Sequence, residues 1–300
     1  MGESLVTVEN VYFYNHFGAG DIFESLEFVK EWMEILGDRK YTYAHGKTPK
    51  IIRELPNVAS MNVTEEMQPM KAININPDSK SMFINTWIGR DGRYVLPGIG
   101  VVVERLWRMH NDMLASIGCR PLTKPIMKYV PNLNYELYPD CINVEYWLRA
   151  EAKHRRIWVI DNGNVQSNQA FNFDFVPIID KVAKEQRDDF FVTTHDSGIQ
   201  RPNVWTTSEI IRSKDGFDLP EVSFLSRFVN GSIGRNSGPH VYTQVRDNWM
   251  DDNYKFLSFT YKQDAGYFIL NQPVLAKKFW SPYINDKQVI ENILEFVREV

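Results

Sequence analysis

The first forty residues change from a strand pattern to a helix pattern across a short glycine-containing turn. Residues 5–14 are rich in Val, Tyr and Phe, which favours a β-strand. After Gly18-Ala19-Gly20-Asp21, apolar side chains recur at spacings of four, three, four and three, which predicts an amphipathic helix ending at Gly37. The apolar positions of this helix are Ile22, Leu26, Val29, Met33 and Leu36.

Strands and helices continue to alternate through the first half. We expect strands at residues 40–46, 71–76 and 80–89, and a short helix from Thr48 with Pro49 in its first turn. A second long helix is predicted over residues 100–117. Its apolar face is formed by Val103, Leu106, Met109, Met113 and Ile117.

The alternation lapses at residues 120–140, which contain four prolines, and then restarts. In the second half, the pattern predicts a strand within residues 154–163, which starts with basic residues and runs into Asn162-Gly163, and further strands at 188–196 and 230–234. Helices are predicted over residues 175–186 and 219–228. Inward positions of the 219–228 helix are Val222, Leu225 and Phe228. A last helix begins at Asn285 with Gln288 at the capping-box spacing. It presents Val289, Ile293, Phe296 and Val297 to an apolar partner.

Such alternation implies right-handed crossovers and mostly parallel sheets, an α/β class. The two halves follow one plan without a detectable sequence repeat. We therefore predict two Rossmann-like domains, at residues 1–150 and 151–280. Residues 281–300 form a C-terminal helix that is a candidate to pack back on the N-terminal domain.

Composition narrows the functional classes. With 43% apolar and 24% charged residues and a net charge of -4, the chain is an ordinary globular one without a basic patch for nucleic acid. Two cysteines in 300 residues suit a reducing, cytoplasmic compartment. The first residues lack the features of a secretion signal, and no apolar run is long enough for a transmembrane segment, which leaves peripheral membrane contact open.

The turn at residues 234–239 is a candidate phosphate site. Gly234 and Gly238 let the backbone approach a ligand, Ser237 adds a hydroxyl and Arg235 a cation, and a helix N-terminus follows. A simple steric turn is the alternative. Neither glycine-bearing turn supplies G-x-G-x-x-G after a strand, which disfavours a dinucleotide-dependent oxidoreductase.

Further candidates for binding phosphate or sugar follow the first strand of the second half. Asn162, Gly163, Gln166 and Ser167 could bind phosphate or sugar hydroxyls, although an Asn-Gly turn explains the stretch equally well. Glu221 could accept both ribose hydroxyls, or serve only as the acid of a first helical turn.

Asp21 has two interpretations. A carboxylate on the first loop of the first half could face a nucleotide diphosphate across a cleft and deprotonate an incoming hydroxyl. Alternatively, it caps the helix that we expect to start at Ile22.

We expect the same half to contact a sugar, or the acceptor molecule that carries the incoming hydroxyl. The candidates are His16, Gly18 and Gly20 around the first turn, and Asn85, Trp87 and Arg90 near a strand end, with Trp87 as an aromatic platform. His195 could lie near the nucleotide. His110, inside a helix, is expected to be packed or solvated.

Two segments resemble the heptosyltransferase-like family of glycosyltransferases. "HFGAGDIFESLEFVKEW" is similar to its "lGD" opening, and "DLPEVSFLSRFVNGSIGRNSGPHV" to its acidic-leucine helix, strand and "D-[ST]-G-p-x-H" segment. The resemblance implies a GT-B fold, two Rossmann-like domains facing across a cleft, with the donor on the C-terminal domain and the acceptor on the N-terminal one.

The same resemblance assigns roles. It implies Asp21 as general base and Ser237, Gly238 and Pro239 as the phosphate-binding turn. Asn236 replaces the family's acid, His240 is displaced, and the family's lysine after the second domain's first strand has no counterpart. These departures put heptose and ADP in doubt, and Arg235 is expected to supply the missing positive charge.

The predicted function is therefore an inverting glycosyltransferase that moves a hexosyl or pentosyl group from a nucleoside-diphosphate sugar to a hydroxyl of a glycan or other acceptor. No D-x-D pair is present, so we expect neither a metal nor another cofactor. The alternatives are a sugar-nucleotide 2-epimerase of the same architecture and a non-catalytic nucleotide-sugar-binding module.

Overall fold

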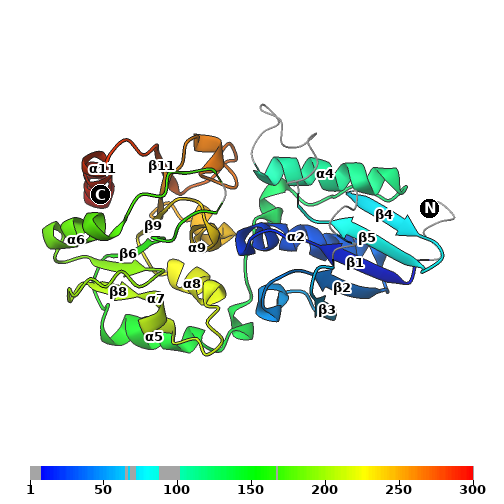
Figure 1. The fold of residues 1–300 in the computed structure, drawn as a ribbon, viewed down its shortest axis with the longest axis horizontal. Coiled ribbons are helices and arrows are strands. Elements are labelled where there is room, and N and C mark those ends of the chain that lie inside the picture. The colour runs from blue at the N-terminus through cyan, green and yellow to red at the C-terminus, as the bar shows by residue number, and fades with distance from the viewer. Residues whose placement is uncertain (1–7, 65–66, 68–71, 88–101, 167, 300) are drawn as a thin grey trace. The chain divides into compact units, whose positions relative to one another are not determined.

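The computed structural model describes residues 8–64, 67, 72–87, 102–166 and 168–299 (Figure 1). The chain divides into two compact units, Met1–Pro131 and Asn132–Val300. This boundary precedes the predicted one at residue 150, because helix α5 (Cys141–Ala150) belongs to the second unit. The α5 residue Trp147 packs edge-on against Trp205, and Asn143 Nδ2 donates to the Ile211 carbonyl at 2.8 Å.

The first unit contains a five-stranded sheet in the order β3-β2-β1-β5-β4. Its strands are β1 (Asn10–Tyr14), β2 (Lys40–Ala44), β3 (Val58–Met61), β4 (Ile73–Asn76) and β5 (Ser81–Asn85). β1 runs parallel to β2 and β5, as predicted, whereas β4 is antiparallel to β5. Only a tight turn joins β4 to β5, and a parallel pair would need a crossover of a dozen or more residues. The sequence pattern did not predict β3.

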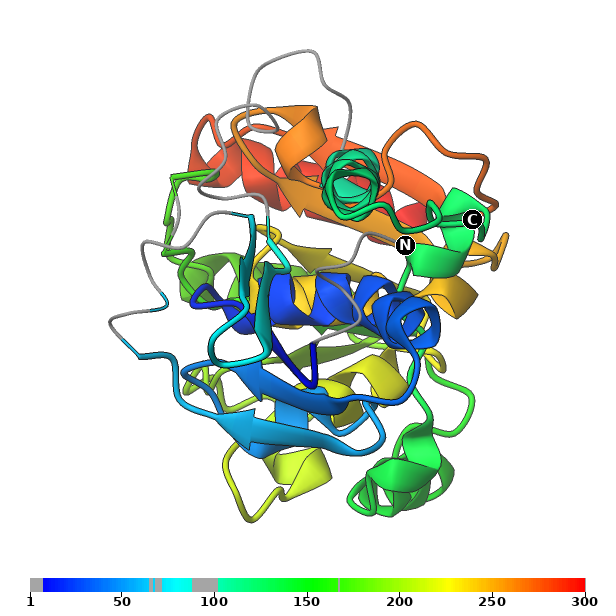
Figure 2. The same ribbon diagram turned by 90° about the vertical axis from the view of Figure 1, so that its right-hand side faces the viewer.

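Helices α2 (Ala19–Leu36) and α4 (Val102–Ser116) accompany this sheet, with the 3₁₀ helices η1 (Pro49–Ile52) and η4 (Ile126–Tyr129) beside α2 (Figure 2). Thr48 caps η1 by accepting from Lys50 N, as the sequence predicts. His110 is packed: its Nδ1 accepts from Trp32 Nε1 at 2.9 Å, and its ring stacks on Phe28.

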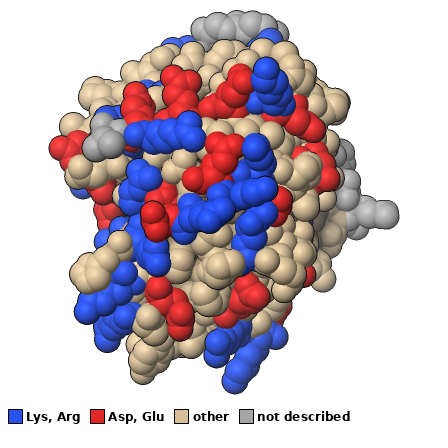
Figure 3. Space-filling model, turned by 90° about the vertical axis from the view of Figure 1, so that its left-hand side faces the viewer, with Lys and Arg blue, Asp and Glu red and all other residues tan. Residues whose placement is uncertain are grey.

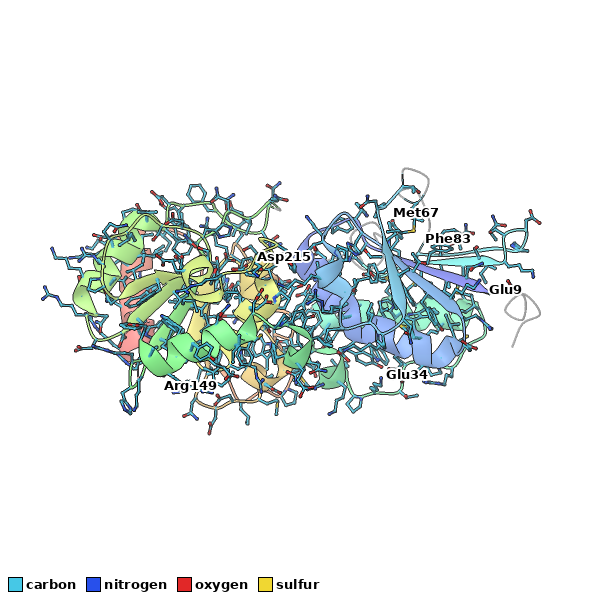
Figure 4. The ribbon with its side chains drawn as sticks, turned by 90° about the horizontal axis from the view of Figure 1, so that it is seen from below. Glu9, Glu34, Met67, Phe83, Arg149 and Asp215 are labelled. Carbon is cyan, nitrogen blue, oxygen red and sulfur yellow. The ribbon has the colours of Figure 1, made fainter. Side chains whose placement is uncertain are left out.

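A small apolar cluster covers part of the same sheet. Tyr14, Ala44 and Met67 form its buried centre, and Phe83 packs against them. Figure 4 shows Met67 and Phe83 close together within this unit. The ring of Tyr12 stacks on Phe83 with centroids 4.9 Å apart, so side chains of β1 and β5 cover the sheet together.

The second unit contains a six-stranded, all-parallel sheet in the order β11-β10-β9-β6-β7-β8. The strands are β6 (Ile157–Ile160), β7 (Phe190–Thr193), β8 (Val204–Thr206), β9 (Gly231–Gly234), β10 (Lys255–Phe259) and β11 (Lys277–Ser281). β6, β7 and β9 match the predicted strands, whereas β10 and β11 were not predicted. Gly231 has a structural reason: a Cβ there would lie 2.3 Å from the Lys255 carbonyl oxygen of the neighbouring strand.

Short helices follow most of these strands. They are η5 (Tyr135–Leu137), α6 (Val176–Glu185), α7 (Thr207–Ile211), α8 (Leu219–Ser226), α9 (Gly238–Thr243), α10 (Arg246–Trp249) and η6 (Gln263–Ala265). The prediction that Phe228 points inward is wrong, because α8 ends two residues earlier and the Phe228 side chain is 50% exposed.

The last helix, α11 (Asp286–Arg298), starts as predicted, with Asn285 Oδ1 accepting from Gln288 N at 2.9 Å. Its apolar face packs into the core of the second unit beside α6, where Phe296 contacts Trp158 at 5.3 Å between ring centroids. Arg156 also donates to the Val297 carbonyl at 2.8 Å. The prediction that this helix packs back on the N-terminal domain is therefore wrong.

Opposite charges are interleaved on the end of the molecule seen in Figure 3. Ion pairs of the second unit include Arg156–Asp189 at 2.9 Å and Arg201–Asp180 at 2.6 Å. Among the described residues, no helix combines the length and the apolar character that crossing a membrane requires.

Candidate active site

Each sheet has a point at which the strand order reverses. In the first unit β1 lies between β2 and the later strand β5, and in the second β6 lies between β7 and the later strand β9. Ligands of open α/β sheets bind outside the carboxyl ends of the strands at such switch points. The loops after β1 and β5, and those after β6 and β9, are therefore the places to examine.

Asp21 lies in the first turn of α2, directly after β1. The helix begins at Ala19, three residues earlier than predicted, and Gly18 is its N-cap. Asp21 Oδ2 accepts from Gly18 N at 2.7 Å, so Asp21 supports the helix cap from the third helical position and is not the N-cap of a helix starting at Ile22 that we expected. A Cβ on Gly18 would lie 2.9 Å from that oxygen, so the glycine leaves room for the carboxylate.

The surroundings of Asp21 favour its protonated form. Burial raises its pKa from 3.8 to about 6, although the Gly18 hydrogen bond and the charge of Lys47 act in the opposite direction. Close by, the buried Tyr43 hydroxyl lies 3.1 Å from Ser25 Oγ and 2.7 Å from Thr86 Oγ1. A half-buried carboxylate whose pKa is near neutrality is suited to proton abstraction.

The predicted acceptor residues differ in accessibility. His16 is half-buried and its ring lies 4.0 Å from that of Phe17, whereas Gly20 is buried. Trp87 is only 9% exposed, and its backbone N donates to Asn85 Oδ1 at 3.0 Å. Trp87 is therefore not the open platform that we expected, and the Asn85 side chain closes a turn at the end of β5. Arg90 lies outside the described residues.

The sequence pattern did not identify Asp161, the main acceptor at the second switch point. This side chain is 1% exposed and follows β6 directly. Its Oδ1 accepts from Gly163 N at 3.2 Å and Thr194 Oγ1 at 3.1 Å, and its Oδ2 accepts from Ser237 Oγ and from His240 N at 3.3 Å. An acid immediately after the first strand of the unit was the available signal.

We expected Arg235 to offer its cation to a diphosphate, but the side chain is fully buried. The group lies 4.7 Å from the ring centroids of both Phe173 and Phe175. It donates to Asn172 Oδ1 at 3.1 Å and to the Asn162 carbonyl at 3.4 Å. Arg235 thus fixes the loop after β6 against the loop after β9.

The predicted phosphate turn retains two unused backbone donors. Asn236 has a left-handed φ of 55°, and its side chain is bonded to the Ala265 carbonyl and to Gln244 Nε2, both at 2.8 Å. Within the described part of the chain, the N–H groups of Ser237 and Gly238 have no hydrogen-bond partner. Together with Pro239, which has no N–H to offer, these residues open α9.

His240 lies beneath this turn and is neutral. Its Nδ1 accepts from Asn236 N at 3.1 Å, and burial lowers its pKa to about 4. A Cβ on Gly234 would lie 2.8 Å from the imidazole, so this glycine makes room for the ring. His240 therefore shapes the turn as an uncharged group at neutral pH.

The loop after β6 is joined to the loop after β7. Asn162 Oδ1 accepts from His195 N at 2.9 Å, and Asn162 Nδ2 donates to the His195 carbonyl at 3.0 Å. Gln166 is exposed, whereas Ser167 lies outside the described residues. Glu221 is fully buried in the first turn of α8, away from solvent. An exposed acid that we had not considered, Asp196, stands in the loop after β7 and accepts from Gly198 N at 2.8 Å.

Gly163 supplies a test of this loop pair. A Cβ at Gly163 would lie 2.5 Å from Cε1 of the exposed His195 side chain, which can swing aside, so we expect Gly163→Ala to destabilise the protein by no more than about 1 kcal/mol. Urea unfolding measures the change. A Gly163→Ala, His195→Gly double variant should recover most of the loss, and a much larger loss in the single variant would mean that the imidazole ring cannot swing aside.

The fold was compared with known proteins. No family model and no curated protein sequence matches the chain. Among solved structures, the E. coli heptosyltransferase WaaC with ADP aligns with 97% of this chain and 99% of its own, at 9% identity and a TM-score of 0.55. E. coli ADP-heptose LPS heptosyltransferase II aligns over 98% and 100%, at 10% identity and a TM-score of 0.54. WaaC with ADP-2-deoxy-2-fluoro heptose aligns over 97% and 99%, at 8% identity and a TM-score of 0.52.

These structures show the fold of the chain. It is the two-unit α/β fold of GT-B heptosyltransferases, which confirms the predicted fold class and the likeness first suggested by the two sequence segments. Identities near 10% explain why no sequence comparison finds it.

Proposed function

We propose that the protein is an inverting, metal-independent glycosyltransferase. It moves a sugar from a nucleoside-diphosphate sugar to a hydroxyl group of a glycan or other acceptor. Asp21 accepts the hydroxyl proton while that oxygen attacks the anomeric carbon, and the nucleoside diphosphate leaves from the opposite face. Direct displacement inverts the configuration of that carbon.

The observation that carries this proposal is the state of Asp21. Its carboxylate is tethered at the first turn of α2, at the switch point of the first unit, and its pKa is about 6. Such a carboxylate is mostly ionised at pH 7 and is a stronger base than an ordinary aspartate.

The second unit supplies the donor site in this proposal. The free N–H groups of Ser237 and Gly238 bind the diphosphate, and charge developing on the leaving group is stabilised by these dipoles without a metal ion. Arg235 acts indirectly, because it holds the 162–172 loop in place. The solved relatives in fold that carry ADP or an ADP-sugar analogue support a nucleoside-diphosphate sugar as the donor class.

Asp196 is a better candidate than Glu221 for binding ribose hydroxyls. In mononucleotide-binding units, an acid at the end of the second strand takes this role. Asp196 lies in the loop after β7, three residues beyond its last residue Thr193, and is exposed, whereas Glu221 is buried. Gln166, also exposed, remains a candidate for the sugar or the phosphates.

The decisive experiment is a product assay. The protein is first screened by thermal shift against UDP, GDP, ADP, CMP and their sugars, because a bound nucleotide stabilises the native state by mass action. Nucleoside diphosphate released from the preferred sugar is then measured with and without a panel of hydroxyl acceptors, in the presence of EDTA. Release that requires an acceptor and survives EDTA supports transfer. Interconversion of the sugar without an acceptor indicates an epimerase, and binding without turnover a binding module.

The pH dependence of transfer follows from Asp21. Because the base must be ionised, we expect kcat/KM to fall as the pH drops through about 6, by roughly tenfold per pH unit below that value. Initial rates between pH 4.5 and 8 locate this limb. A limb near pH 4, the range of an ordinary aspartate, would exclude Asp21 as the titrating base.

A further inference from the structure

A second carboxyl group lies one helical turn from Asp21. Residues three apart in a helix lie on the same face, so Glu24 lies next to Asp21 along α2. Glu24 belongs to the second turn of α2, at the end of the helix that follows β1 and the switch point, and Phe28 continues the same stripe, where it stacks on Tyr129 and His110. The sequence pattern gave Glu24 no role.

Glu24 is buried in an unusual way. Only 5% of the residue is exposed, and its carboxyl group has no hydrogen-bond or ion-pair partner among the described residues. The contrast on the same helix is Glu31, which is also buried but accepts from Thr123 N at 2.9 Å and from Arg120 at 3.2 Å. Buried acids are normally paired or hydrogen-bonded, so a largely buried acid without a partner favours its neutral form.

Among the described residues, no positively charged group of the elements around Glu24 acts on its carboxyl group. The titratable and charged groups of these elements are Tyr43 of β2, Lys47 after β2, Lys50, Arg53 and Glu54 in and after η1, Glu104, Arg105, Arg108, His110 and Asp112 of α4, and Lys128 and Tyr129 of η4. Within the described residues, Asp21 is the one charge that acts on Glu24, and burial together with that charge raises the pKa of Glu24 well above its usual value. Lys47 acts on Asp21 instead.

We propose that Asp21 and Glu24 form a carboxyl pair that holds a single proton, with Asp21 as the ionised member and Glu24 as the protonated one. Glu24 is then a positioning residue. Because its carboxyl group is neutral, Asp21 carries the single negative charge of the pair, and Glu24 presents an O–H group beside it. This role rests on the proposed transfer reaction, although the existence of the pair does not. Ionisation of Glu24 at alkaline pH would place two negative charges together and set the upper pH limit of the reaction.

The pair can be tested without a substrate. A carboxyl that keeps its proton in the folded state costs nothing below its unfolded pKa and destabilises the fold as the pH rises above it. We therefore expect Glu24→Gln to raise the Tm relative to the parent by about 2 °C or more at pH 8, and by less at pH 4.5. Glu34→Gln, an exposed acid of the same helix, is the matched control and should show no such trend.

The critical measurement is whether the effect of Glu24→Gln on the Tm depends on the charge of Asp21. In an Asp21→Asn background the gain from Glu24→Gln should shrink, because burial then raises the pKa of Glu24 without the added charge of Asp21. Equal gains in both backgrounds would overturn the pair. Should Glu24→Gln fold poorly, carboxyl ¹³C titration of the parent protein decides instead: a glutamate carboxyl that titrates above the usual range supports the proposal, and its absence refutes it.

The pH dependence of kcat/KM tests the positioning role of Glu24 separately from the existence of the carboxyl pair. Glu24→Gln should leave the acid limb of kcat/KM in place and move the alkaline limb upward. An unchanged alkaline limb would refute the positioning role. Coupled titration in a protein without transferase activity would leave the pair established and refute the proposed function alone.

Discussion

Replacing Asp21 with asparagine should reduce the rate of sugar transfer by about 10²–10⁴-fold, the usual contribution of a general base. The substitution is nearly isosteric, and asparagine Oδ1 can still accept from Gly18 N, so the helix cap survives. The loss should appear in kcat, while the affinity for the nucleoside diphosphate changes less than about twofold, because that site is proposed for the other unit. Steady-state rates and calorimetric titration of the nucleotide measure the two quantities.

The matched control for this variant is again Glu34→Gln, which alters an exposed acid of the same helix. Its rate should equal that of the parent. Full activity of Asp21→Asn would exclude the base. An equal loss of nucleotide affinity and rate would instead indicate that Asp21 organises the fold, and Asp21 would then be a structural residue.

The second large effect is expected at Asp161. Asparagine would turn an NH₂ group toward one of the two pairs of donors that the carboxylate now accepts from, at Gly163 and Thr194 or at Ser237 and His240. The hydroxyl of that pair, Thr194 or Ser237, can turn to accept from the new NH₂ group, whereas the backbone N–H, of Gly163 or His240, loses its acceptor, so we expect a destabilisation of about 1–3 kcal/mol. Chemical unfolding measures this change.

Asp161→Asn should also weaken nucleotide binding by about tenfold or more, because a free-energy change of ~1.4 kcal/mol is enough for that and the carboxylate that holds Ser237 is gone. Asp188→Asn is a suitable control, since Asp188 is fully exposed and its ion pair with Arg155 at 3.4 Å is a surface one. Unchanged stability of Asp161→Asn would mean that the four donors find other acceptors, and that the carboxylate does not organise the turn.

Local pattern was sufficient for most of the individual elements. The spacing of Ile22, Leu26 and Val29 predicts α2, and Asn285 with Gln288 predicts the start of α11. These signals are reliable because amphipathic periodicity and end caps depend on residues within one or two turns. The strand β10 lacked comparable alternation, because the burial of a parallel strand on both faces removes it, whereas β11 is a half-exposed strand at the edge of the sheet.

The resemblance of two short segments was also sufficient to predict the GT-B fold. It could not predict where the C-terminal helix packs, because an apolar helix face indicates that a packing partner exists but does not identify that partner. Whether that face meets α6 or another element is decided by shape and by long-range bonds such as that from Arg156 to the Val297 carbonyl.

By itself, then, the sequence determined the alternating elements, the two-unit plan and the candidate base, all of which follow from short-range periodicity and motif. Tertiary structure alone decided the state of the charged groups. It buried Arg235 against two aromatic rings, gathered four donors on Asp161, and enclosed Glu24 without a partner beside Asp21. The physical reason is that desolvation and hydrogen bonding depend on residues far apart in the chain, and these terms determine which side chains carry charge and which can reach a ligand.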